Sequence, residues 1–66
     1  MPLPSLSPRE RQILELLATG MSPKEAAAEL SLSYETVRDY LKQIYQKLHV
    51  RGRTEAVLRF LEAGEG

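Results

Sequence analysis

The most constraining feature of the chain is a helical spacing of apolar residues between positions 31 and 50. Four apolar residues follow one another at intervals of four, three and four: Val37, Leu41, Ile44 and Leu48. This is the period of an amphipathic α-helix with one narrow buried stripe. The spacing predicts a helix over about residues 34–49.

Polar residues occupy the opposite face of this helix: Glu35, Arg38, Asp39, Lys42 and Gln46. Such side chains carry the donors and acceptors that read base edges in the major groove of DNA. A polar face is also ordinary for a helix on a globular surface, where Arg38 and Lys42 would pair with Glu35 and Asp39. The pattern alone leaves both interpretations open.

A short helix and a tight turn are predicted before this segment. Ser22, Pro23 and Glu25 give three helix-start signals: a cap, a proline suited to the first position and a glutamate that completes a capping box. This helix is predicted over about residues 23–30, and Ser33 is a suitable cap for the next one. Two helices joined by about three residues form a helix-turn-helix unit.

Two more helices complete an all-α prediction. The first covers about residues 8–19, with the same start signal at Ser7 and with Gly20 just past its end. The fourth covers about residues 53–63, with Glu55 bonding back to the amide of Gly52.

The ends and the inner face of the fourth helix are also predicted. Val57, Phe60 and Leu61 are expected to face inward. Residues 1–66 form a single domain, whose ends at 1–6 and 64–66 are expected to be loose.

Length and composition exclude most other classes of protein. A chain of 66 residues has no room for an ordinary enzyme pocket of roughly 300 Å³ or more. It has no cysteine and one histidine, His49, so no disulfide and no metal site is expected. No apolar run reaches the ~20 residues of a membrane span, and no signal peptide is present. We expect a cytoplasmic protein, associated with the nucleoid, without catalytic residues, cofactor, small-molecule ligand or membrane contact.

Positive charge is concentrated around the third helix although the whole chain has no net charge. Residues 34–53 contain five basic and two acidic side chains, a net charge of +3. This distribution is a modest electrostatic footprint for nucleic acid. The acidic remainder weakens non-specific binding and makes a second subunit more important for affinity.

Four spaced motifs resemble the LuxR-type (GerE-type) helix-turn-helix domain of bacterial transcription regulators, including response regulators. They are LSPRERQIL at 6–14, LLATGMSPKEAA at 16–27, LSLSYETVRDYL at 30–41 and KLHVRGRTEAV at 47–57. The resemblance covers nearly the whole chain. It implies a four-helix bundle with helices two and three as the helix-turn-helix and the third as the recognition helix. It also implies double-stranded DNA as the partner.

The resemblance carries specific roles to residues of this chain. The residues expected to contact bases are Arg38, Asp39 and Lys42. Those expected to contact phosphates are Lys24, Ser33, Thr36, Lys47 and Arg51. A homodimer contact on the fourth helix is expected at Thr54, Leu58, Arg59 and Glu62.

The chain departs from the family pattern at two positions. Tyr40 replaces the usual histidine, and Ala26 replaces the usual isoleucine, which predicts a smaller core around the second helix. Tyr34, Tyr40 and Tyr45 do not share one face, so a base-stacking platform is not expected. We expect all three to border the core.

Other functions remain open on the sequence. One is promoter binding like that of the fourth region of a sigma factor. RNA polymerase is a candidate partner of the regulator. Another is a helical protein-interaction module, which does not require Thr36, Arg38 and Lys42 to converge on phosphates. Charge reversal at Arg38 and Lys42 separates this module from a DNA-binding domain.

Overall fold

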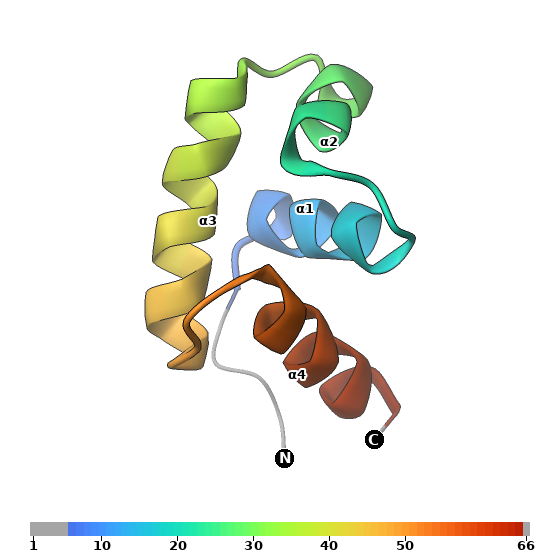
Figure 1. Cartoon of the computed structure of the whole chain (residues 1–66), viewed down its shortest axis with the longest axis vertical. Helices are drawn as coiled ribbons and strands as arrows, with labels where there is room; N and C mark the ends of the chain where they lie inside the picture. The colour runs from blue at the N-terminus through green and yellow to red at the C-terminus, as the bar shows by residue number, and fades with distance from the viewer. Residues whose placement is uncertain (1–5, 66) are drawn as a thin grey trace.

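The computed structural model describes residues 6–65, which form four α-helices and no strand. The helices are α1 (Pro8–Ala18), α2 (Pro23–Leu30), α3 (Tyr34–Leu48) and α4 (Arg53–Glu65). In Figure 1, α3 stands along one side of the molecule, with α2 near its start and α4 near its end. The all-α prediction with a helix-turn-helix at α2 and α3 is confirmed.

Serine caps begin three of the helices. The Ser7 hydroxyl accepts a hydrogen bond from the amide of Glu10, and the Glu10 carboxylate accepts one from the amide of Ser7. Ser22 and Glu25 form the same reciprocal pair before α2. These bonds satisfy amides that have no partner within the helix. Hydrogen bonding by Ser22, chiefly from its backbone amide, holds the pKa of the Glu25 carboxyl below its ordinary value.

Left-handed residues end three of the helices. Gly20, after α1, has φ of 104°, which glycine adopts without steric cost. Ser31 after α2 and His49 after α3 have φ of 57° and 56°. In a residue with a Cβ atom this conformation is strained by roughly 1–2 kcal/mol.

Replacing His49 with glycine is expected to raise the free energy of unfolding by about 0.5–1 kcal/mol. The relief of the left-handed strain outweighs the loss of the exposed imidazole at this helix end. Urea unfolding followed by circular dichroism measures the change. Gln46→Gly, three residues earlier inside α3, is the matched control and should destabilise by about 1 kcal/mol. A loss of stability in both variants would contradict strain at His49.

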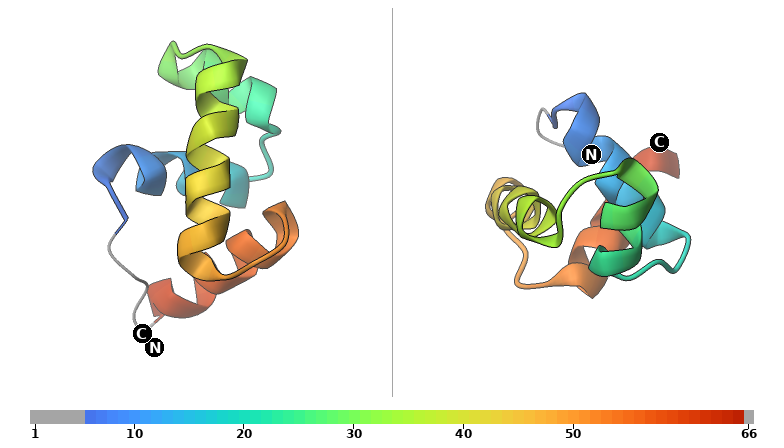
Figure 2. Two further views of the ribbon diagram at one scale, coloured as in Figure 1. Left: turned by 90° about the vertical axis from the view of Figure 1, so that its left-hand side faces the viewer. Right: turned by 90° about the horizontal axis from the view of Figure 1, so that it is seen from above.

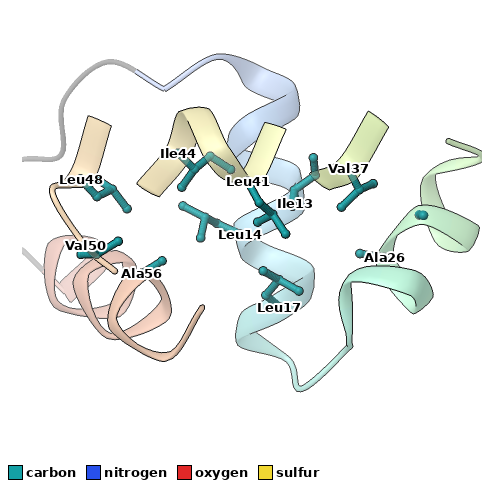
Figure 3. Close-up of a cluster of buried hydrophobic side chains, with 11 residues drawn as sticks. Ile13, Leu14, Leu17, Ala26, Val37, Leu41, Ile44, Leu48, Val50 and Ala56 are labelled. Atoms are coloured by element: carbon teal, nitrogen blue, oxygen red, sulfur yellow. The ribbon is translucent and has the colours of Figure 1, made fainter. Parts of the chain in front are cut away.

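The core lies between the inner faces of all four helices. Its α3 stripe is the predicted one: Val37, Leu41, Ile44 and Leu48. The other helices and the loop before α4 supply Ile13, Leu14, Leu17, Ala26, Ala27, Val50 and Ala56, most of which Figure 3 labels around that stripe. The buried side chains of α2 are the small Ala26 and Ala27, and Ala26 stands where the family usually has isoleucine.

The fourth helix differs from its prediction in length, face and cap. It extends to Glu65, two residues past its predicted end. Leu61 is 47% exposed, whereas the small Ala56 is fully buried in the core. Glu55 accepts a bond from the amide of Arg51 at 3.3 Å, one residue before the predicted Gly52.

Leu6, the last residue of the predicted loose N-terminus, packs against the core. Residues 1–5 and residue 66 lie outside the described residues. The ends of α1 and α3, at Ala18 and Leu48, each differ from the sequence prediction by one residue, while α2 ends at Leu30 as predicted.

Candidate nucleic-acid interface

The third helix presents its polar face to solvent. Both views in Figure 2 show α3 on one outer side of the molecule, uncovered by the other three helices. Since the apolar stripe of α3 is buried, Arg38, Asp39 and Lys42 are all exposed. Among residues 6–65 the structure gives none of these three an ion pair. The alternative in which Arg38 and Lys42 pair along the helix is therefore not observed.

The start of α3 combines a serine cap with a second hydroxyl. The Ser33 hydroxyl accepts a hydrogen bond from the amide of Thr36 at 3.1 Å and lies 2.8 Å from the Thr36 hydroxyl. Ser33 is exposed and Thr36 is half-buried. The two hydroxyls thus lie together at the positive end of the helix dipole, where anions are favoured.

An exposed aromatic ring brings Lys24 and Arg38 to the same place. The Lys24 Nζ atom lies 5.7 Å from the centre of the Tyr34 ring, and the Arg38 guanidinium carbon lies 6.0 Å from it. Tyr34 itself is 42% exposed, so the prediction that it borders the core is wrong. Tyr40 and Tyr45 do pack against the core. Burial raises the pKa of the Tyr45 phenol, partly offset by the charge of Arg53.

Lys47 is bound within the protein. Its Nζ atom lies 2.8 Å from the Glu10 carboxylate, whose side chain is 2% exposed, while the Lys47 side chain is 40% exposed. Burial alone would raise the pKa of Glu10. The hydrogen bonds from Lys47 and Ser7 and the lysine charge outweigh it and hold the pKa below its ordinary value of 4.5. This pair ties the start of α1 to the last turns of α3.

The α3–α4 loop and α4 carry the remaining predicted residues. Arg51 is exposed just after α3, and Thr54, Leu58, Arg59 and Glu62 are exposed on α4. Arg59 also has a role inside the chain, because its Nη1 atom donates a hydrogen bond to the Leu48 carbonyl oxygen at 2.9 Å. A shallow hollow of about 280 Å³ lies beside Leu17, Val57 and Leu58.

Other kinds of site find no support in the described part of the chain. Within it there is no group of three His, Cys, Asp or Glu residues that could hold a metal ion. None of the four described helices is long and apolar enough to cross a membrane.

The family of the chain follows from comparison with known proteins. Residues 4–60 match the GerE family, described as bacterial regulatory proteins, luxR family. The chain belongs to the luxR family. It is a LuxR-type DNA-binding domain, of the kind that transcription regulators contain. Its relatives are transcriptional regulators, a family not known as enzymes. The family that matches is the luxR family and not that of the sigma-factor alternative.

Relatives of this luxR-family domain differ in how much of their length it covers. The spore germination protein GerE of Bacillus subtilis is 45% identical over 62 residues, which cover 94% of this chain and 84% of that protein. The probable HTH-type transcriptional regulator GfsR of Streptomyces halstedii is 53% identical over 57 residues. Those residues are 86% of this chain and only 24% of GfsR.

Solved structures share the fold of this luxR-family domain. The structure of the transcription factor GerE aligns with a TM-score of 0.82 and 42% identity, covering 91% of this chain and 90% of that one. The response regulator ChrA, from a heme-sensing two-component system, aligns with a TM-score of 0.80 and 43% identity. That alignment covers 88% of this chain and 29% of ChrA.

Proposed function

We propose that the domain binds a specific duplex DNA sequence by placing α3 in the major groove. The observation that carries the proposal is the division of α3 into two faces. One face is locked into the core, and the other exposes Arg38, Asp39 and Lys42 without ion pairs among the described residues. A recognition helix needs this combination of rigid support and free donors and acceptors.

The three exposed residues of α3 have different chemistry toward bases. Arg38 and Lys42 donate hydrogen bonds, for which the O6 and N7 atoms of guanine are the usual acceptors. The Asp39 carboxylate repels phosphate but accepts a hydrogen bond from the N4 amino group of cytosine. Asp39 therefore adds selectivity at the expense of general affinity.

Phosphate contacts fix the orientation of the helix. Lys24, Ser33 and Thr36 lie around the start of α3, where free amides and the helix dipole also favour an anion. Arg51 extends the positive charge beyond the other end of α3. Lys47 keeps two ammonium protons beyond its bond to Glu10 and is half-exposed, so it can serve a flanking phosphate as well.

A dimer on two half-sites accounts for the absence of net charge on the domain. Half-sites one helical turn of DNA apart, about 34–36 Å, let two recognition helices bind together. The proposed contact is the exposed face of α4 at Thr54, Leu58, Arg59 and Glu62. Leu58 is 55% exposed and supplies its apolar centre, while Arg59 is partly occupied by its bond to Leu48.

The site of action is the bacterial cytoplasm, where RNA polymerase is a second candidate partner.

Selection from a pool of random duplexes tests this function. The domain is mixed with the pool at increasing salt concentrations, and the retained fragments are sequenced. Binding that falls steeply with salt and enriches a repeated half-site is the expected result. A folded domain that retains no duplex at low salt would overturn the proposal in favour of a protein-interaction module.

Arg38→Ala is expected to weaken binding to the selected duplex by about 1–3 kcal/mol and to relax sequence choice. A titration with the selected and a random duplex measures both effects. Arg11→Ala removes the same charge from the exposed side of α1, where no contact is proposed, and should change neither affinity appreciably. Equal losses on the two duplexes for Arg38→Ala would refute base reading by this residue.

A further inference from the structure

Tyr34 is an exposed aromatic residue for which the fold has no packing role. It is the first residue of α3 and is 42% exposed, while the other aromatic residues of the described chain, Tyr40, Tyr45 and Phe60, pack against the core. Its removal therefore opens no cavity in the core. The ring must be explained by what lies around it on the surface.

Two cations from two different helices surround the Tyr34 ring. Lys24 comes from the first turn of α2, and its Nζ atom lies 5.7 Å from the ring centre. Arg38 follows Tyr34 by four residues on α3, and its guanidinium carbon lies 6.0 Å from the ring centre. Both distances fall within the roughly 6 Å over which a ring attracts a cation. The ring thus links both helices of the helix-turn-helix through their cations.

We propose that Tyr34 is a positioning residue of the DNA interface that holds Lys24 and Arg38 ready for their contacts. The proposal rests on the proposed function, in which Lys24 binds phosphate and Arg38 reads bases. Long lysine and arginine side chains lose rotamer freedom when they are fixed at an interface. A ring that already restricts both chains in the free protein lowers this cost on binding.

The contact is tested first without DNA. The ring current of Tyr34 should shift the NMR signals of the side-chain CH₂ protons next to the Lys24 ammonium and the Arg38 guanidinium to lower frequency. The shifts should persist in Tyr34→Phe and vanish in Tyr34→Leu, with the melting temperature unchanged. Unshifted signals in the wild-type protein would overturn the proposal whatever the domain binds.

Binding then tests whether the contact matters at the interface. Tyr34→Leu should weaken binding to the selected duplex by about five- to tenfold, because two long side chains that the ring no longer restricts must then be ordered on binding. Tyr34→Phe should stay within about twofold of wild type, because it keeps the ring. Wild-type affinity in Tyr34→Leu would overturn the proposal. An equal loss in Tyr34→Phe would overturn it too, since it would make the hydroxyl a direct DNA contact.

A double-mutant cycle separates positioning from independent contacts. In an Arg38→Ala background, Tyr34→Leu should cost only about two- to threefold, because one of the two cations is already gone. Full additivity would contradict the proposal. If the wild-type domain binds no duplex at all, the proposed function fails, and with it any interface role for Tyr34, although the NMR shifts would still report the ring contact.

Discussion

Replacing Leu41 with alanine is expected to lower the free energy of unfolding by about 2–5 kcal/mol. The side chain lies in the middle of the α3 stripe, packed among core residues such as Ile13 and Leu14 (Figure 3), and is 6% exposed. Truncation removes buried methyl groups and leaves a cavity that neighbours on rigid helices fill only in part. Urea unfolding followed by circular dichroism measures the loss.

Leu58→Ala is the matched control for this prediction. It makes the same chemical change on α4, where the leucine is 55% exposed. The free energy of unfolding should change by at most about 0.5 kcal/mol. Equal effects of the two substitutions would mean that α3 is not anchored as the structure places it.

The loss at Leu41 is large relative to the total stability of so small a domain. A chain of this length is typically stable by only about 3–10 kcal/mol. Leu41→Ala should therefore weaken DNA binding by raising the unfolded fraction, whereas Arg38→Ala should weaken binding in a fully folded protein. Leu41→Met, which keeps the volume, should retain most of the stability, at a cost below about 1.5 kcal/mol.

The sequence predicts the first three helices well because their signals are local. The serine caps at Ser7, Ser22 and Ser33 bond to amides only three residues away. The α3 stripe is clear because its four large apolar residues all lie on one side. Elements determined by near neighbours can be recognised without any knowledge of the fold.

The inner face of α4 shows where such local signals fail. Apolar residues lie around much of this helix, including Val57, Leu58 and Leu61, so hydrophobicity alone does not select a face. In the structure the small Ala56 is buried in the core, whereas the larger Leu61 is exposed. Which side of α4 faces the core is therefore known only once the helices are placed.

The candidate site also depends on contacts that no local pattern gives. The i, i+4 spacing of Tyr34 and Arg38 is visible in the sequence, but the approach of Lys24 requires the turn between α2 and α3. The bond between Lys47 and Glu10 joins residues 37 positions apart. The sequence therefore predicts a phosphate contact at Lys47 but not its acidic partner, which only the fold brings close.

Replacing Lys47 with methionine is expected to lower the free energy of unfolding by about 2–4 kcal/mol at neutral pH. The change leaves the Glu10 carboxylate, 2% exposed, without its cation, and an unpaired buried charge is costly. The estimate is below that for a fully buried pair because Lys47 is half-exposed. Lys42→Met is the matched control on the exposed face of α3 and should change stability by at most about 0.5 kcal/mol.

The pH dependence of this loss identifies its cause. In the wild-type domain the pKa of Glu10 is lower folded than unfolded, so the pair stabilises the fold above about pH 4.5, and the stabilisation is lost as the pH falls through the folded value. In Lys47→Met the pKa of Glu10 rises, because burial is no longer opposed by the lysine. Acid therefore costs the variant less than the wild type, and the stability gap between them should narrow below about pH 4.5. Glu25 titrates alike in both proteins and cancels in the difference.

Adding Glu10→Gln to the variant should recover part of the loss at neutral pH, since the amide still accepts the Ser7 bond without a charge. A gap that stays constant from neutral to acidic pH would show that Lys47 stabilises α3 by packing alone.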